Sequence, residues 1–126
     1  RCGPWPGTKT MAPHPPAGWF PRRGEIYLVA MDTVRPVVVL SIDGLNRHAR
    51  DVCLVALTTV NRPNLSLRVA IAAGAGGIRK DSWAKCDQVT TIPKKDLIYP
   101  PLGRLPSSLL QSIEEKVRIT LGLVAL

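Results

Sequence analysis

The stretch "RPVVVLS", residues 35–41, starts with a permanently charged arginine and continues into four consecutive apolar residues, 37–40. Valine favours β-strands, and an unbroken apolar run indicates a strand that is buried on both faces. A charged side chain at the mouth of such a strand is costly to bury without a partner. The position of Arg35 therefore raises the question of what its charge is for.

Four further segments predict strands, because each is rich in β-branched or aromatic residues and bounded by turn residues. They are "GEIYLVAM" (24–31), "DVCLVALTTV" (51–60), "LSLRVAIA" (65–72) and "DSWAKCDQVTTI" (81–92). The polar segment "DGLNRHAR" (43–50) is expected to be a turn. Several short strands at this spacing favour a small β-barrel over a sheet built from βαβ units.

The C-terminal segment "PSSLLQSIEEKVRITLGL" (106–123) predicts an amphipathic helix. Leucine, isoleucine and valine recur every four residues from 109 to 121, so this face is expected to pack on the barrel. Ser107 or Ser108 can cap the start, and Ser108 with Gln111 can form a capping box. Gly122 is the expected stop.

The 126 residues suit a single folded domain, which we expect at residues 22–126. Residues 1–21 hold six of the twelve prolines. Because proline blocks helices and central strands, this segment is expected to be an irregular arm, with Trp5, Trp19 and Phe20 as possible anchors. The formal charge of +8 favours a polyanion or an acidic protein as partner.

Several classes of protein are disfavoured by what the sequence lacks. No run approaches the ~18 apolar residues of a membrane span, and no apolar signal-peptide core is found, so a cytoplasmic location is expected. Cys2, Cys53 and Cys86 are widely spaced and form no Cys-x-x-Cys or Cys/His cluster, so we expect no metal site. The segment "AAGAGGIRK" (72–80) lacks the Gly-Lys-Ser/Thr of a P-loop and is expected to be a flexible loop between strands.

Five fragments, taken in order, resemble the MazF/PemK toxins of bacterial toxin–antitoxin systems. They are "PRRGEIYLV", "RPVVVLS", "VALTT", "GGIRKDSWAKCDQVTTI" and "LGRLPSSLLQSIEEKVRITLGL". Each fragment is weak alone, but their order and spacing are specific and span residues 22–123. The resemblance implies a small SH3-like β-barrel with a C-terminal helix, in agreement with the strands predicted above.

The resemblance also implies an activity, the sequence-specific cleavage of single-stranded RNA without a metal or any other cofactor. In such an endoribonuclease the ribose 2′-hydroxyl attacks the neighbouring phosphorus and leaves a 2′,3′-cyclic phosphate and a 5′-hydroxyl. The phosphorane oxygens then need positive charge, the 2′-hydroxyl must lose a proton, and the leaving oxygen must gain one.

The catalytic residues implied by the resemblance are Arg35 and Thr58. A guanidinium is planar, always charged and matched to phosphate oxygens, so Arg35 suits charge stabilisation. It holds its proton too tightly to act as a general base, which leaves the proton acceptor open. The Thr58 hydroxyl can donate to a phosphoryl oxygen or relay a proton. Without the resemblance, a surface charge and a β-forming threonine would explain the same residues.

RNA-binding residues follow from the same resemblance. Asp87 and Gln88 align with positions that meet bases, and both carry acceptors for an unpaired base edge. The positions expected to border the groove are Ser41, Asn46, Thr59 and Ser82. The positions expected to bind backbone phosphates are Arg47, Arg79 and Lys80.

One segment departs from the family's pattern. The family usually has a long, glycine-rich loop between its first two strands, often with an acidic residue near the active site. Here only "AMDTV" (30–34) separates the first apolar run from Arg35, and Asp32 is its one acid.

Two other functions compete with the ribonuclease toxin. One is a toxin on the same barrel that resembles the CcdB poisons of DNA gyrase, and the other is an inactive RNA-binding module. The ribonuclease reading further implies a homodimer and an acidic, MazE-like antitoxin that occupies the RNA groove. An all-DNA analogue separates cleavage from binding. It has no 2′-hydroxyl, so a ribonuclease cannot cut it, whereas a binding protein can still hold it.

Overall fold

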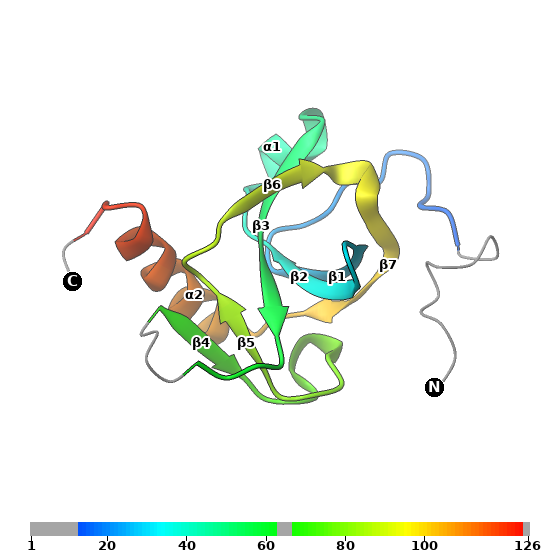
Figure 1. Cartoon of the computed structure of the whole chain (residues 1–126). Helices are drawn as coiled ribbons and strands as arrows, with labels where there is room; N and C mark the ends of the chain where they lie inside the picture. Colours follow the sequence, from blue (N-terminus) through cyan, green and yellow to red (C-terminus); the bar gives the residue numbers. More distant parts are fainter. Residues whose placement is uncertain (1–12, 63–66, 125–126) are drawn as a thin grey trace.

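The computed structural model describes residues 13–62 and 67–124 of the chain. Its strands are β1 (Glu25–Ala30), β2 (Val34–Val39), β3 (Asp51–Thr58), β4 (Arg68–Ile71), β5 (Ser82–Lys85), β6 (Thr90–Pro93) and β7 (Leu97–Arg104). They form one curled sheet in the order β4-β5-β3-β2-β1-β7, with β6 also paired to β3 (Figure 1). The mainly β class is confirmed, and the sheet stays open because the end strands β4 and β7 are not neighbours.

The predicted burial of the "RPVVVLS" strand on both faces is confirmed. Val37, Val38 and Val39 are fully buried, and they alternate between two cores. One core contains Val38 and lies under the C-terminal helix, while the other contains Val37 and Val39 and lies against β1 and β3. The three strands β1, β2 and β3 therefore form a rigid centre.

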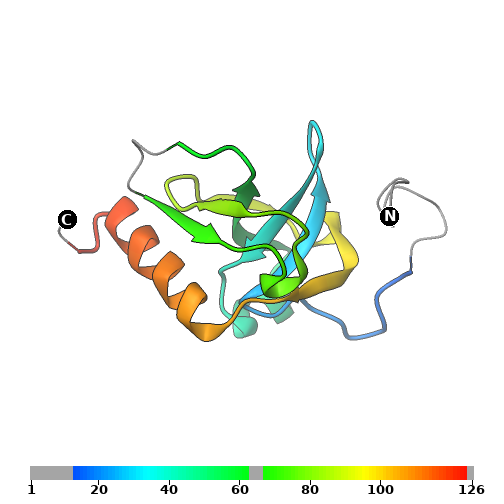
Figure 2. The ribbon, with the colours of Figure 1, turned by 90° about the horizontal axis from the view of Figure 1, so that it is seen from below.

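The C-terminal helix α2 (Ser107–Thr120) packs along β4, as Figure 2 shows. Ile113 is fully buried in the first core, and Leu109, Leu110 and Val117 pack around it, so the predicted apolar face is confirmed. Gly122 ends the helix with a positive φ of 74°. Its neighbour Leu123 donates its N–H to Arg118 O at 2.8 Å, which closes the last turn.

The predicted serine caps are wrong. The N-cap position is Pro106, and no side chain bonds the first turn of α2. Pro106 fixes the chain in an extended conformation before the helix, which leaves Ser107 and Ser108 inside the first turn. Ser112 instead donates to Ser108 O at 3.2 Å.

The predicted strand 81–92 is two strands separated by a bend. β5 pairs with the end of β3 and β6 with its beginning, so both lie along the same side of β3. The bend at 86–89 is closed by a hydrogen bond from Gln88 N to Lys85 O at 2.9 Å. The predicted strand 65–72 forms only over β4, and residues 65–66 lie outside the described part of the chain.

Two elements did not follow from the sequence pattern. β7 contains Pro100 and Pro101, which a strand tolerates at an edge, and β7 is an edge strand paired to β1 alone. The segment predicted as a polar turn forms a short helix, α1 (Asp43–His48). It begins without a side-chain cap and depends on Asn46, whose N–H donates to Ile42 O at 3.0 Å.

The glycine-rich segment connects β4 to β5, as predicted, but it is packed closely. The 3₁₀ turn Ala75–Gly77 lies directly against β7. A Cβ on Gly77 would collide with the carbonyl oxygen of Leu102, and a Cβ on Gly103 would lie 2.6 Å from Gly76 O. Glycine is therefore required here by the close approach of two backbones.

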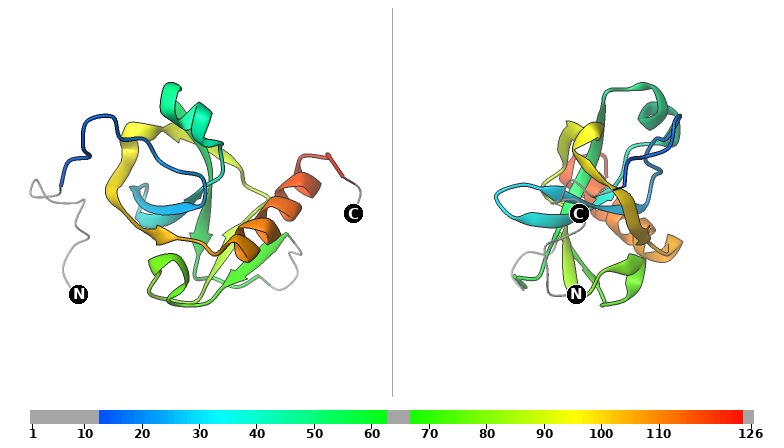
Figure 3. Two further views of the ribbon diagram at one scale, coloured as in Figure 1. Left: turned by 180° about the vertical axis from the view of Figure 1, so that it is seen from behind. Right: turned by 90° about the vertical axis from the view of Figure 1, so that its right-hand side faces the viewer.

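The described part of the N-terminal arm runs beside β7 (Figure 3). Trp19 is its anchor, because the indole packs on the second core and stacks edge-to-face on Tyr27 and Tyr99, each with ring centroids 5.9 Å apart. The indole N–H also donates to Tyr27 Oη at 3.3 Å. Trp5 lies outside the described residues.

Candidate active site

Arg35 and Thr58 meet at one end of the sheet. β2 and β3 pair antiparallel with Val37 opposite Ala56, so the same register brings the start of β2 beside the end of β3. Both side chains line one pocket of about 500 Å³. The two residues implied as catalytic are therefore brought together by the pairing of two central strands.

Arg35 has one acidic neighbour. Its Nε lies 3.6 Å from Asp32 Oδ1, in the short connection between β1 and β2. Asp32 is 80% exposed and Arg35 34% exposed, so water and salt screen this pair and it contributes little to stability. The Arg35 guanidinium can therefore leave Asp32 and bind a stronger anion such as a phosphate.

Thr58 presents a hydroxyl with a defined direction. The residue is buried, and its Oγ1 accepts a hydrogen bond from Val60 N at 3.1 Å. Because this bond uses the oxygen as an acceptor, the hydroxyl hydrogen is left to donate into the pocket. Thr58 can thus serve as a fixed donor to an oxygen that gains negative charge.

The pocket is strongly cationic. Its lining residues are Arg35, Thr58, Val60, Arg62, Arg68, Lys85 and Gln88. Four of these seven carry a positive charge and none is acidic. A cleft lined by one sign of charge concentrates ligands of the opposite sign, so this pocket is suited to a phosphate-bearing ligand.

Arg62, Arg68 and Lys85 were missed at the level of sequence. Arg68 sits between Leu67 and Val69 in a strand whose alternate residues point to the core, so its charge occupies the opposite face. The pairing of β4 with β5 places Arg68 directly opposite Lys85. The signal was therefore the same as for Arg35, a charge inside an apolar strand.

Of the two residues predicted to meet bases, Gln88 lines the pocket with Arg35 and Thr58. Asp87 faces Arg68, with its Oδ1 3.8 Å from Arg68 Nε. The bend between β5 and β6 carries Gln88 to the pocket and Asp87 to Arg68, since the chain leaves the ladder at this point.

Thr59, Arg79, Lys80 and Ser82 lie around a different pocket. It has a volume of about 480 Å³, shares no lining residue with the first, and is floored by apolar residues such as Ile78. Thr59 follows Thr58 and points to the other face, as neighbours in an extended chain do. The Ser82 hydroxyl already donates to Lys80 O at 2.9 Å.

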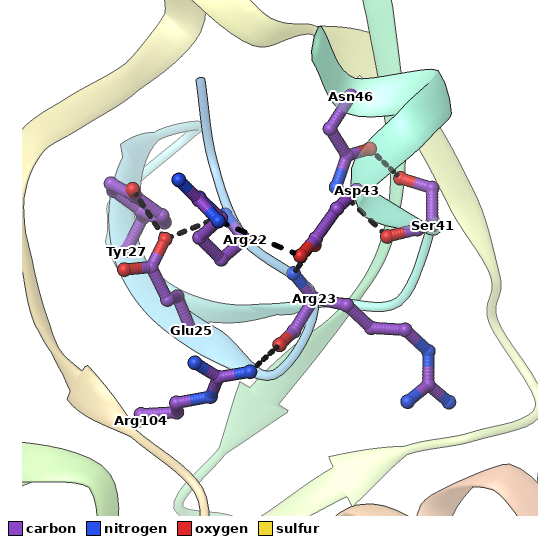
Figure 4. Close-up of polar contacts among 8 residues, drawn as sticks. All are labelled: Arg22, Arg23, Glu25, Tyr27, Ser41, Asp43, Asn46 and Arg104. Carbon is purple, nitrogen blue, oxygen red and sulfur yellow. Dashed lines mark hydrogen bonds and ion pairs between the residues drawn. The ribbon is translucent and has the colours of Figure 1, made fainter. Parts of the chain in front are cut away.

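Ser41 and Asn46 are not brought to either pocket. They follow the opposite end of β2, and Figure 4 shows them facing each other beside Asp43. Ser41 Oγ donates to Asn46 Oδ1 at 2.5 Å, and Asn46 Nδ2 donates to Ser41 O at 2.8 Å. Because Asn46 is fully buried, this pair holds α1 against the sheet and offers no free edge to a base. Arg47 lies at the same end, near the ring of Phe20.

The described residues contain no group of three or more His, Cys, Asp or Glu placed to hold a metal ion. Burial raises the pKa of the Cys86 thiol to about 11, with the nearby charge of Asp87 adding to this effect. Cys86 therefore stays protonated and is a core residue. Within the same part of the chain, no helix is both long and apolar enough to cross a membrane.

Comparison with known proteins identifies the family. The sequence profile of the PemK-like, MazF-like toxins of type II toxin-antitoxin systems matches residues 22–121. The chain belongs to this family. The resemblance seen in the five sequence fragments is confirmed, and nothing in the matches supports a CcdB-like toxin.

Solved structures of MazF toxins share the fold. The Mycobacterium tuberculosis toxin MazF-mt6 is 28% identical with a TM-score of 0.71, over 80% of this chain and 99% of that one. An endoribonuclease from a mycobacterial species is 25% identical with a TM-score of 0.72, over 85% and 96% of the two chains. An endoribonuclease in complex with its cognate antitoxin, also mycobacterial, is 25% identical with a TM-score of 0.70, over 84% and 97%.

Proposed function

We propose that this toxin is an endoribonuclease that cuts single-stranded RNA with Arg35 and Thr58 as its catalytic residues. The observation that carries the proposal is their convergence in a pocket whose lining holds four cations and no acid. Such a pocket binds the RNA backbone and also stabilises the negative charge that develops on a phosphorane. The solved relatives named as endoribonucleases support the same activity.

The proposed reaction forms a bond between the ribose O2′ and the phosphorus and breaks the bond from the phosphorus to O5′. Arg35 neutralises a non-bridging oxygen, and the Thr58 hydroxyl donates to one. We assign the 2′ proton to the Asp32 carboxylate, which lies beside Arg35. Solvent water supplies the proton taken up by O5′. The products are a 2′,3′-cyclic phosphate and a 5′-hydroxyl, and no cofactor takes part.

The partners are proposed from the relatives and from charge. One solved relative is in complex with its cognate antitoxin. The formal charge of +8 suits both RNA and an acidic antitoxin segment. We further propose a homodimer that acts in the cytoplasm. The toxin domain is proposed to comprise residues 22–126, since the family match begins at residue 22, with residues 1–21 as a separate arm.

The test is cleavage of a long, mixed-sequence single-stranded RNA in EDTA, with every new 5′ end mapped. The wild-type protein is expected to cut at one short sequence and to leave an all-DNA analogue intact. Arg35→Ala and Thr58→Ala are expected to abolish the cuts while keeping the thermal unfolding profile. Cuts that survive both substitutions would defeat the assignment of these residues. RNA binding by a silent wild-type protein would favour the inactive RNA-binding module.

A further inference from the structure

Arg68 is a buried cation whose side chain has unused hydrogen-bonding capacity. The side chain is only 9% exposed, and its Nε has no hydrogen-bond partner in the described structure. The Asp87 oxygen 3.8 Å away is too distant for a hydrogen bond and is likewise unpartnered. The Nε is enclosed and faces Asp87, whereas Arg68 also lines the cationic pocket, so its guanidinium is placed to meet an anionic ligand there.

The pairing of β4 with β5 places a second cation next to Arg68. Arg68 and Lys85 are direct cross-strand partners, and both line the pocket. Like charges placed opposite each other in a ladder destabilise the sheet. The arrangement is relieved when an anion lies between the two charges, which is what a substrate phosphate would supply.

Arg68 and Arg35 approach the pocket from different walls. In the sheet order, β5 and β3 lie between β4 and β2, so three strand spacings of about 4.8 Å separate the two backbones. Each arginine also has its own acidic neighbour, Asp32 for Arg35 and Asp87 for Arg68. The two guanidinium groups are therefore held at two separate points.

We propose that Arg68 binds a second phosphate of the RNA, next to but distinct from the scissile phosphate at Arg35. Asp87 is then a positioning residue that orients the Arg68 guanidinium, rather than a residue that meets a base. The proposal rests on the proposed function, because it takes RNA as the ligand of this pocket. It adds a backbone anchor that sets where the strand lies relative to Thr58.

The experiment measures binding to a short RNA that contains the cleaved sequence, made uncleavable by a 2′-deoxynucleotide at the cut. A series of RNA strands is made in which one phosphate at a time is replaced by an uncharged methylphosphonate. The nucleotide on the 5′ side of that methylphosphonate is a 2′-deoxynucleotide. A matched strand keeps that deoxynucleotide with a normal phosphate. The wild-type protein should lose about ten- to a hundredfold in affinity at the scissile phosphate and again at one other phosphate.

For Arg68→Gln, replacing that other phosphate should no longer lower the affinity, whereas replacing the scissile phosphate should still lower it. The slope of log affinity against log salt should also become shallower by about 0.7, the value for one phosphate contact on a single strand. Arg68→Lys keeps the charge without the planar fork and should restore part of the affinity. Arg50→Gln is the matched control. Arg50 is exposed and directly precedes the start of β3, at the end of the strand opposite Thr58.

Asp87→Asn removes the charge and keeps the shape, so it tests the positioning role. It should weaken the response at the second phosphate and leave the mapped cleavage sequence unchanged. A changed base preference at the cut would overturn this role and return Asp87 to base contact.

The wild-type series decides the main point without any variant. A loss of affinity at the scissile phosphate alone would overturn the second anchor even if Arg68→Gln failed to fold. Failure of the proposed function has a different signature, since it appears as the absence of any mapped cut in the cleavage test, before the binding series begins.

Discussion

The close approach of Gly77 to Leu102 of β7 makes Gly77→Ala a direct test of how the loop before β5 is held. Gly77 has a φ of +85°, and an added Cβ would meet both the carbonyl oxygen and the side chain of Leu102. A side chain at positive φ costs about 1–2 kcal/mol. Overpacking against a backbone that cannot yield adds roughly 1–3 kcal/mol. We therefore expect Gly77→Ala to lower the free energy of unfolding by about 3 kcal/mol.

Two matched variants separate the causes. Gly74→Ala has the same backbone problem, with a φ of +97°, but open space around its Cβ, so only the first cost of about 1–2 kcal/mol applies. Gly103→Ala approaches the same contact from β7, meets Gly76 O at 2.6 Å and has no positive φ, so only the overpacking cost applies. Replacing glycine by alanine lowers the conformational entropy of the unfolded chain in all three variants alike, so this effect cancels when the variants are compared.

Urea denaturation followed by circular dichroism gives the three free energies. The expected order of destabilisation places Gly77→Ala above both single-cause variants, with a gap to Gly74→Ala of about 2 kcal/mol. Equal destabilisation of Gly77→Ala and Gly74→Ala would refute the reasoning, because it would mean that the 3₁₀ turn does not press on β7 in solution.

Three further outcomes are expected. The raised pKa of Cys86, about 11 against an ordinary 9.0, means that the folded thiol keeps a proton that the unfolded chain releases. The Cys86 contribution to stability should therefore fall by roughly 2–3 kcal/mol as pH rises from 9 to 11. Thermal melts of Cys86→Ala should lose this part of the slope and keep the part from Tyr27, whose pKa burial also raises. Asp32→Asn should slow single-turnover cleavage by about a hundredfold while leaving affinity for an uncleavable RNA unchanged or higher, and unchanged cleavage would remove Asp32 as proton acceptor. Arg35→Lys should also lose about a hundredfold in cleavage rate despite its retained charge, because one point charge cannot replace the guanidinium fork, and wild-type rates would show that charge alone suffices.

The meeting of Arg35 with Thr58 was expected from the family resemblance, since the residues alone allowed a surface charge and a β-forming threonine. The pairing of β2 with β3 then places the start of one strand beside the end of the other. Arg68, like Arg35, is a charge inside an apolar strand but was missed. Its neighbour Lys85 comes from a strand 17 positions away whose pairing is non-local, so nothing in the stretch itself revealed a second cation.

Ser41 and Asn46 show the opposite failure. Both have the polar side chains that an RNA groove needs, and both follow the motif strand closely in sequence. Their side chains bond each other, because Ser41 Oγ donates to Asn46 Oδ1 and Asn46 Nδ2 donates to Ser41 O. Lys94 Nζ also donates to the backbone oxygen of Asn46 at 2.7 Å, a contact between distant positions that no local pattern records.

The two arginines of the pocket are anchored differently, and this difference suits two separate tasks. The partner of Arg35 is 80% exposed, so the pair is screened and the guanidinium can follow the charge as it moves onto the phosphorane oxygens. The Arg68 side chain is buried, its acidic partner is only 30% exposed, and its position is fixed before RNA arrives. A fixed cation lowers the entropy lost on binding, whereas a cation that its own acidic partner holds only weakly keeps its charge for the negative oxygens that develop during the reaction. Both arginines should therefore contribute to affinity, whereas the chemical step should depend mainly on Arg35.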